Sequence, residues 1–333
     1  MPQKNAPGKS AAEITKGDLE VMIIPESDVV RLLDPGALLD GLHDGFLSLA
    51  RGDIQTPDRP EITVPGKGFN LSMPAWRPGS PIMVKMVSVF DGNLELGLPN
   101  HLAMINLFDP VTGAPLCVMD GTHITGMRTA AAAVLSVREI ARRNSRVATI
   151  VGAGVQGREH LRLLPLVRPF DEILVSSLHV EDARKLARLH PQARAVEDVE
   201  AAVRRSDVVC LASHAHEPVI EAGWVRAGSH VTSVGYAPPR GELPVSLART
   251  GRLYIEEDAA FKPPPVGCGE LQGVAIGDAI RFGDALSGNA PLRVSDSEIT
   301  VYKAMGIAME DLVAAEIVYR NAVRDRMATN VVF

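Results

Sequence analysis

The sequence predicts an α/β protein built on a Rossmann-type, doubly wound parallel sheet, preceded by an α+β part. From residue 144 onward, apolar strand-like runs alternate with helix-like segments, which is typical of chains that form parallel sheets. Residues 54–120 instead contain short β-type runs separated by glycine and proline, which indicates antiparallel strands. A chain of 333 residues has room for two such domains.

Composition excludes several classes of protein. The 34 basic and 40 acidic side chains give a formal net charge of −6 without any basic block, so we expect no nucleic-acid partner. No window approaches ~18 uncharged apolar residues, so we expect no membrane span. The chain starts with polar residues rather than a signal peptide, and Cys117, Cys210 and Cys268 are far apart and odd in number. Both features favour a cytoplasmic protein.

The N-terminal part is expected to begin with a tail over residues 1–18 that is loose or forms an extra strand. Two short helices fit the sequence after Ile24, and the second carries a row of leucines and Phe46 before Gly52 ends it. Among the β-type runs that follow, the segment DPVTGAP predicts a hairpin turn. The segment TGMRTAAAAVLSVREIARRN then predicts a helix, because alanine has a high helix propensity.

The second part of the chain is predicted to alternate strands and helices. The last segment, SEITVYKAMGIAMEDLVAAEIVYRNAVRD, predicts a long amphipathic helix that packs back onto the first part. We therefore expect one domain over residues 1–127, completed by residues 308–333, and a second domain over residues 128–307.

Gly152, Gly154 and Gly157 form the sequence GAGVQG between an apolar strand and the start of a helix. In a dinucleotide-binding turn the first glycine permits the tight turn, the second lets the backbone approach a pyrophosphate, and the third allows close helix packing. The helix N-terminus then offers free N–H groups to the phosphates. Strands further along the chain complete the context, so we expect dinucleotide binding rather than an ordinary glycine-rich turn.

The end of the second strand of this part indicates which dinucleotide is expected. An acidic residue there would bind a ribose 2′-hydroxyl and select NAD. Here the strand ends in Ser176 and Ser177, followed by Leu178 and His179, and no acid occurs before Glu181. The two serines leave room for a 2′-phosphate. We therefore expect NAD(P), with a slight preference for NADP.

Five motifs occur along the chain in the order and spacing of a known family. They are MDGTHITGMRTAAAA (119–133), VGAGVQG (151–157), TSVG (232–235), GCGELQG (267–273) and VYKAMGIAMED (301–311). Together they resemble the ornithine cyclodeaminase/mu-crystallin family over roughly residues 25–325. The resemblance implies that residues 1–127 bind a small amino- or imino-acid substrate and pair two subunits into a homodimer, and that residues 128–307 bind NAD(P).

The resemblance also implies roles for individual residues. Lys85 matches the family's active-site lysine, and Arg128 matches an arginine near the substrate carboxylate and the cofactor. Arg59 matches a second carboxylate-binding arginine, and Met305 falls on a position that faces the substrate. The positions expected to contact the cofactor are Asn100, Arg128, Thr129, Gly152, Gly154, Val155, Gln156, Gly157, Ser176, Ser177, Ser213, Val234 and Gly235.

Two of these residues suit the chemistry without reference to the family. Arg128 opens the alanine-rich helix just before the dinucleotide part, and its planar guanidinium can bind a carboxylate through two hydrogen bonds. A solvated or capping arginine is the alternative. Lys85 lies among apolar residues of a strand, so it points either to solvent or inward. An inward lysine would have a lowered pKa that suits proton transfer.

Other polar residues are weaker candidates. His101 and His123 lie at the ends of β-type segments near Lys85 and Arg128, where either could act as a secondary acid. His214 and His216 could suggest a metal pair, but no carboxylate or cysteine cluster accompanies them, so we expect no metal.

One departure from the family pattern bears on the reaction. Cyclodeaminases and some alanine dehydrogenases of the family carry an aspartate shortly after the TSVG strand, but the matching residue here is Ala237. We therefore expect an enzyme, an NAD(P)H-dependent oxidoreductase that reduces a small 2-imino acid or cyclic ketimine carboxylate to an amino acid. The alternatives are an ornithine cyclodeaminase that recycles NAD, an alanine dehydrogenase-like enzyme, and a non-catalytic binding protein of the mu-crystallin kind.

Overall fold

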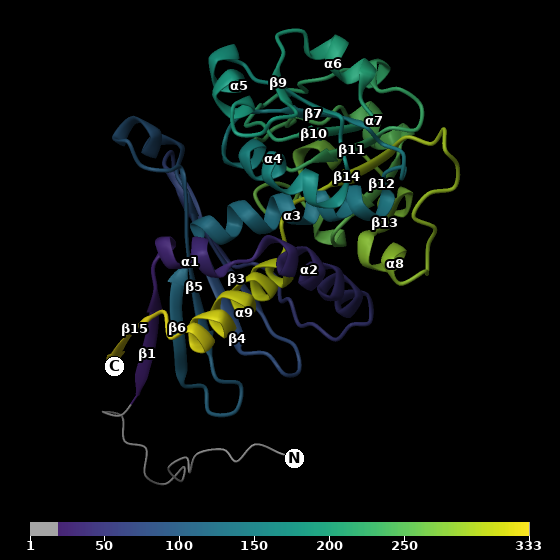
Figure 1. Cartoon of the computed structure of the whole chain (residues 1–333). Helices are drawn as coiled ribbons and strands as arrows, with labels where there is room; N and C mark the ends of the chain where they lie inside the picture. Colours follow the sequence, from purple (N-terminus) through teal and green to yellow (C-terminus); the bar gives the residue numbers. More distant parts are fainter. Residues whose placement is uncertain (1–18, 333) are drawn as a thin grey trace.

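The computed structural model describes residues 19–332, which form two sheets with a long helix between them (Figure 1). An eight-stranded sheet has the order β13-β12-β14-β11-β10-β7-β8-β9, and a seven-stranded sheet has the order β15-β1-β6-β5-β4-β3-β2. The predicted class, a doubly wound parallel sheet with an α+β part before it, is confirmed. The expected tail over residues 1–18 lies outside the described residues.

The seven-stranded sheet takes its strands from both ends of the chain. They are β1 (Glu20–Ile24), β2 (Glu61–Val64), β3 (Gly68–Ala75), β4 (Ile82–Val89), β5 (His101–Phe108), β6 (Pro115–Asp120) and β15 (Thr329–Val332). All neighbours pair antiparallel except β1 and β6, which are parallel. The antiparallel run from β2 to β6 is as predicted, whereas the sequence patterns did not indicate β1 or β15 as strands.

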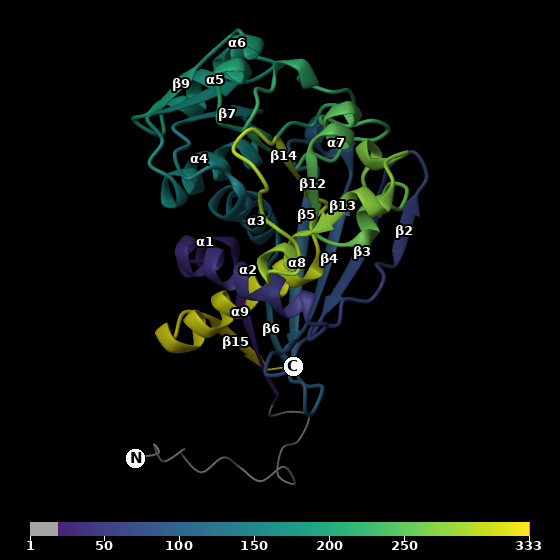
Figure 2. The ribbon, with the colours of Figure 1, turned by 90° about the vertical axis from the view of Figure 1, so that its right-hand side faces the viewer.

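Three helices, α1 (Glu26–Leu32), α2 (Pro35–Ala50) and α9 (Ala308–Asp325), lie on one face of this sheet (Figure 2). Asp34 caps α2 by accepting a hydrogen bond from the amide of Ala37 at 2.7 Å, which satisfies one of the free donors at the helix start. Along β4 every second side chain faces these helices, because successive side chains of a strand alternate between faces. Lys85 is on that buried face.

Helix α3 (Thr122–Ile140) runs between the two sheets and packs against α2, α9, β5 and β11 as well as α4 (Figure 1). The residues from Ala130 to Ala133 are completely buried, and their small side chains let neighbouring elements approach closely. The expected domain division between residues 127 and 128 falls inside this helix, and that division stays a prediction.

The eight-stranded sheet is parallel throughout. Its strands are β7 (Val147–Val151), β8 (Glu172–Ser176), β9 (Ala193–Ala195), β10 (Val208–Leu211), β11 (His230–Ser233), β12 (Arg252–Ile255), β13 (Ala279–Arg281) and β14 (Thr300–Lys303). Its connecting helices are α4 (Val155–Val167), α5 (Val180–Ala187), α6 (Val199–Arg205), α7 (Val245–Thr250) and α8 (Phe282–Leu286).

The prediction of one unbroken helix at the end of the chain is wrong at its start. Residues 300–303 form β14, which lies between β11 and β12, and α9 begins only at Ala308. The side chains of Thr300, Val301 and Tyr302 are of the β-branched and aromatic kinds that favour strands, and all are buried. Gly306, with a φ of 73°, then turns the chain from the strand into the helix.

Candidate active site

The predicted phosphate-binding turn has the backbone geometry that its chemistry requires. Gly152 has a φ of 120°, and a Cβ there would lie 2.2 Å from the carbonyl oxygen of Ala212. A Cβ on Gly157 would lie 2.0 Å from the carbonyl oxygen of Gly152, so only glycine allows α4 this close to the turn. Gly154 borders open space, and no side chain caps α4. The turn therefore fits a pyrophosphate against the free N–H groups of the helix.

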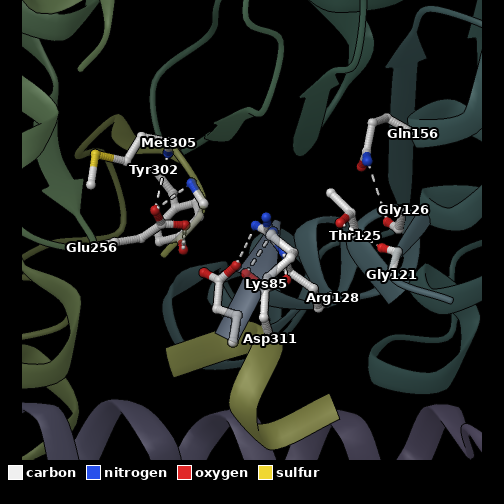
Figure 3. Close-up of polar contacts among 12 residues, drawn as sticks. Lys85, Gly121, Thr125, Gly126, Arg128, Gln156, Glu256, Tyr302, Met305 and Asp311 are labelled. Atoms are coloured by element: carbon white, nitrogen blue, oxygen red, sulfur yellow. Dashed lines mark hydrogen bonds and ion pairs between the residues drawn. The ribbon is translucent and has the colours of Figure 1, made fainter. Parts of the chain in front are cut away.

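The neighbours of this turn are residues that the sequence assigned to cofactor binding. The amide of Gly152 donates to the carbonyl of Ser176 at 2.8 Å, which puts the end of β8 and Ser177 beside the turn. Val155 is exposed, and Thr129 on α3 is buried. The side chain of Gln156 reaches α3, where its Nε2 donates a hydrogen bond to the backbone carbonyl of Gly126 at 3.3 Å (Figure 3).

Lys85 points inward, where its Nζ lies 2.6 Å from Oδ2 of Asp311 (Figure 3). The side chains of Lys85 and Asp311 are 1% and 0% exposed. Burial is the largest cause that lowers the pKa of Lys85 to about 7; Arg128 adds to this effect and Asp311 opposes it. The inward alternative for Lys85 is therefore the one observed, and its ammonium and amine forms are both present near neutral pH.

Arg128 is held by two consecutive carboxylates at the start of α9. Its Nη1 lies 2.7 Å from Oε2 of Glu310, and its Nε lies 3.0 Å from Oδ1 of Asp311. Burial alone would lower the pKa of Arg128, but Asp311 and Glu310 raise it, so the guanidinium keeps its charge. A Cβ on Gly306 would lie 2.2 Å from Nη1, so a glycine there leaves room for the guanidinium.

Glu256, which directly follows β12, connects this cluster to the chain after β14. Its Oε1 accepts a hydrogen bond from the hydroxyl of Tyr302 at 3.0 Å. Its Oε2 accepts from the amides of Met305 at 3.0 Å and Gly306 at 2.7 Å. Nη2 of Arg59 donates to the carbonyl of Gly306 at 2.7 Å. Arg59, Lys85, Arg128 and Met305, which the sequence assigned to the substrate, therefore belong to one cluster.

A second buried carboxylate, Glu242, joins the carboxyl ends of β10 and β11. It accepts five hydrogen bonds at 2.6–3.1 Å, from the amides of Ser213, Val234 and Gly235 and from the hydroxyls of Ser213 and Ser233. The three cofactor positions expected in this region therefore lie side by side, and Glu242 holds them there.

Lys303 and Glu270 form a buried ion pair next to Glu242. Nζ of Lys303 lies 3.0 Å from Oε1 of Glu270 and donates to the carbonyl of Gly235 at 2.8 Å.

Asn100, the remaining position expected to contact the cofactor, lies just before β5, at the end of the connection from β4 (residues 90–100). Its backbone carbonyl accepts a hydrogen bond from the amide of Phe90, at the start of the same connection, at 2.8 Å.

Sequence reasoning did not single out the acids of this site, Asp311, Glu310, Glu256 and Glu242. A signal for Glu310 and Asp311 exists in the segment AMEDLVAA, where these two adjacent acids interrupt an otherwise apolar run. A helix that buries this run also buries the acids, and buried carboxylates require cationic partners. Glu256 and Glu242 carry no such signal, because each lies in a loop after a strand and its partners come from other parts of the chain.

The histidines singled out in the sequence do not gather into a cluster in the described part of the chain. The pKa of His101 is lowered to about 4, chiefly by burial and then by Lys85 and Arg128, so this ring is neutral near pH 7. Within residues 19–332 no three His, Cys, Asp or Glu side chains form a cluster that could hold a metal.

Cys117, Cys210 and Cys268 are unpaired and buried. No helix of the described chain is long and apolar enough to cross a membrane.

Comparison with known proteins identifies relatives that match nearly the whole fold. The model of the ornithine cyclodeaminase/mu-crystallin family matches residues 20–326. The ketimine reductase mu-crystallin of Mus musculus is 34% identical over 273 residues, which cover 80% of this chain and 85% of that protein.

Two solved structures are also similar. The Δ1-pyrroline-2-carboxylate reductase of Thermococcus litoralis, in complex with NADH and L-proline, has a TM-score of 0.87 and 33% identity, covering 93% of this chain and 100% of its own. An archaeal alanine dehydrogenase dimer with bound NAD has a TM-score of 0.88 and 29% identity, covering 95% and 100%.

Proposed function

This chain belongs to the ornithine cyclodeaminase/mu-crystallin family, and on that premise we propose that it is an enzyme that uses NAD(P)H to reduce a small 2-imino acid or a cyclic ketimine carboxylate to an amino acid. The observation that carries the proposal is the buried cluster of Lys85, Arg128 and Asp311 close to a turn built for dinucleotide phosphates. The cluster combines a fixed cation for a carboxylate with an amine that titrates near neutral pH.

The cofactor supplies a hydride to the imine carbon when it is bound. The turn at Gly152, Gly154 and Gly157 would hold its pyrophosphate against the start of α4. Ser176 and Ser177 offer hydroxyls and no carboxylate at the end of β8, which supports a preference for NADP over NAD.

The substrate carboxylate would bind to Arg128, with Arg59 nearby. Nε and Nη1 of Arg128 are engaged by the carboxylates of α9, and Nη2 makes no hydrogen bond to a described residue. The guanidinium therefore has a donor left for an anion, while its orientation is fixed by Asp311 and Glu310. Fixing the orientation in advance lowers the entropy lost when the substrate binds.

Lys85 would supply the proton that the reduction requires. As the imine carbon receives the hydride, the nitrogen takes a proton from the Lys85 ammonium, which becomes a neutral amine and later regains a proton from water. A pKa of about 7 suits this role, because proton transfer is most efficient from an acid whose pKa is near the working pH. Asp311, 2.6 Å away, orients Nζ.

An amino-acid dehydrogenase acting on a 2-keto acid and ammonia is the second candidate, favoured by the similarity to alanine dehydrogenases over 95% of the chain. A cyclodeaminase is disfavoured, because the side chain at Ala237 offers no carboxylate. Glu242, on the same loop, already accepts five hydrogen bonds and is not available as an acid or base.

A homodimer is part of the proposal. The helices cover one face of the seven-stranded sheet, and apolar side chains of β5, including Leu102 and Met104, are 39% and 47% exposed on the other face. In the register of β4 and β5, Met104 lies opposite Met86, which continues this apolar surface. We expect a second copy of the chain to bury this apolar surface, because exposed apolar patches favour contacts between proteins.

A cytoplasmic location also belongs to the proposal. Three unpaired and buried cysteines suit a reducing compartment.

The test follows the absorbance of NADPH or NADH with purified protein and a panel of imines. The panel holds pyruvate with methylamine, pyruvate with ammonia, and the five- and six-membered cyclic ketimine carboxylates. Oxidation on a cyclic ketimine or the methylamine imine supports the reductase, and oxidation with ammonia alone identifies the dehydrogenase. Ammonia released from L-ornithine with NAD, without any imine reduction, would instead make the chain a cyclodeaminase. Cofactor binding without turnover in any assay would indicate a binding protein.

A further inference from the structure

We propose that the substrate pocket extends from Lys85 along an uncharged wall of the seven-stranded sheet, that Phe69 of β3 and Tyr236 of the loop after β11 close this wall, and that the enclosed space selects an imine with an uncharged side chain. The inference rests on the proposed function and deepens it, because it names the class of side chain that the substrate carries. Substrates with a second carboxylate or with an ammonium group are rejected.

The register of the strands places the wall beside Lys85. Side chains alternate between the two faces of a strand, so Val87 and Val89 share the face of β4 that carries Lys85. Residues directly opposite each other on neighbouring strands also share a face, and on β3 these are Leu71, opposite Val87, and Phe69, opposite Val89. At about 3.3 Å per residue, the far end of this wall lies roughly 13 Å along the sheet from Lys85, enough for a small ring or a short aliphatic chain.

The protein covers the near part of this face more completely than the far end. On β4, Met83, Lys85 and Val87 are 0%, 1% and 4% exposed. Val89 and its neighbour Phe69 on β3 are only half-buried. The cover of the face therefore thins beyond Val87, where the side chain of a substrate can lie against the sheet.

Tyr236 closes the far end of the wall from the side of the parallel sheet. It directly follows Gly235, a position expected to contact the cofactor. The rings of Tyr236 and Phe69 meet edge to face, with their centroids 6.4 Å apart and an angle of 75° between the ring planes, which is a favourable arrangement. Burial is the largest cause that raises the pKa of Tyr236, so its phenol is neutral. The contact therefore joins the sheet that binds the substrate to the loop that borders the cofactor.

The wall carries no permanent charge beyond Lys85. On β5, Ala103 and His101 continue the same face in the register with β4. Of the wall positions beyond Lys85, only His101 can be charged near neutral pH. Its pKa is lowered to about 4, by burial first and then by Lys85 and Arg128, so the ring is neutral near pH 7.

Two acids lie near Tyr236, and neither is a counter-ion for a substrate inside the pocket. Glu61 is exposed on the edge strand β2, where the hydroxyl of Thr63 donates to it and water screens its charge. Glu270 is buried and paired with Lys303 at 3.0 Å. In the proposed function, the cations of the buried cluster bind the first carboxylate and the imine nitrogen. A second charge on the substrate would therefore be buried without a partner, which is costly, whereas a hydrocarbon gains from contact with the wall.

Turnover of two imines of the same shape tests the selection. They form from methylamine with 5-methyl-2-oxohexanoate and with 2-oxoglutarate, whose side chains are alike in size and differ in charge. In the wild type we expect kcat/KM to be at least ~100-fold higher for the uncharged imine, because an unpaired buried charge is strongly disfavoured. Similar values of kcat/KM for the two imines would overturn the proposal.

Two substitutions test the roles of the rings. Phe69→Arg gives a second carboxylate a partner, so kcat/KM for the 2-oxoglutarate imine should rise about tenfold or more relative to the uncharged imine. Tyr236→Leu opens the wall without adding charge and should raise kcat/KM for the phenylpyruvate imine about tenfold relative to the pyruvate imine. Val111→Arg, at an 89% exposed residue in the turn between β5 and β6, is the control and should keep the preferences of the wild type. A merely structural role would lower all rates together, so unchanged ratios in both variants would overturn the proposal.

Ligands that cannot be reduced separate this inference from the proposed function. The Kd values of pyrrole-2-carboxylate and pyrrole-2,5-dicarboxylate are measured on the NADH-loaded protein by nicotinamide fluorescence. The dicarboxylate should bind at least ~100-fold more weakly to the wild type, and the difference should shrink in Phe69→Arg. A protein that reduces no imine but shows this difference would refute only the proposed function. One that reduces the charged and uncharged imines equally would refute only the selection. Failure to bind either pyrrole, together with no reduction of any imine, would overturn both.

Discussion

Replacement of Lys85 by methionine is the sharpest test of the proposed reaction. Methionine is similar in size to the lysine it replaces and suits its buried surroundings, but it cannot donate a proton. Asp311 does not lose its last partner, because Arg128 remains 3.0 Å from its Oδ1. We therefore expect Lys85→Met to fold and to bind NADPH, while kcat/KM for the imine falls by at least ~100-fold, the usual contribution of a positioned acid.

The pH profile separates loss of the acid from loss of packing. Only the ammonium form of Lys85 can donate a proton, and its pKa in the free enzyme is about 7. The kcat/KM of the wild type should therefore fall about tenfold for each pH unit above this value, and the residual rate of Lys85→Met should lack this decline. Lys85→Arg, which keeps the charge without a titratable proton, should be as slow as Lys85→Met. Lys67→Met, at an exposed lysine in the turn before β3, is the matched control and should be normal.

Stability supplies a second readout for the same residue. The pKa of Lys85 is about 7 in the folded chain, whereas a fully solvated lysine has a pKa of 10.5, so between these values the unfolded chain binds more protons. The free energy of unfolding of the wild type should therefore rise with pH across this window, relative to Lys85→Met, by up to roughly 5 kcal/mol at 1.36 kcal/mol per pH unit. A Lys85→Met enzyme within tenfold of the wild type, or one with the same high-pH decline, would refute the role of Lys85.

Four further substitutions test other parts of the site. Arg128→Ala should raise the KM for the imine at least ~100-fold and leave the Kd for NADPH largely unchanged; a normal KM contradicts its role. Ser177→Asp should shift the ratio of kcat/KM values toward NADH by about tenfold or more, through a carboxylate that repels a 2′-phosphate. Glu242→Gln replaces an oxygen acceptor by an NH2 group facing backbone donors and should weaken NADPH binding by about tenfold, measured by fluorescence titration. Met104→Lys should yield a monomer in light scattering, since it places charge in the apolar surface.

The phosphate-binding turn shows what could be predicted from the sequence. Gly152, Gly154 and Gly157 act within a stretch of six residues, where the backbone itself makes the contacts, so their spacing along the chain is sufficient evidence. Strand–helix alternation is local in the same sense. The wrong prediction at residues 300–303 had the opposite cause. Three of these four residues favour a strand, but the partners that pair with them, β11 and β12, lie far away in sequence.

The buried cluster around Lys85 and Arg128 shows where sequence reasoning ended. Lys85 and Arg128 were identified by their resemblance to family motifs, yet whether Lys85 faces solvent or the interior depends on which face of β4 the helices cover. Its partner Asp311 is more than two hundred residues away along the chain, and Glu256 comes from a third segment. Pairing between such distant residues has no signal in a single sequence.

The sequence by itself therefore determined the α/β class, the dinucleotide turn and the identity of the basic residues, because each depends on neighbours along the chain. Only the tertiary structure decided the protonation of those residues. It buries Lys85, Arg128, Glu310 and Asp311 together at the meeting point of α3, α9 and β4, and burial makes each charge depend on all the others. The lowered pKa of Lys85 and the raised pKa of Arg128 are properties of that packing, since in water the same side chains would keep their ordinary values.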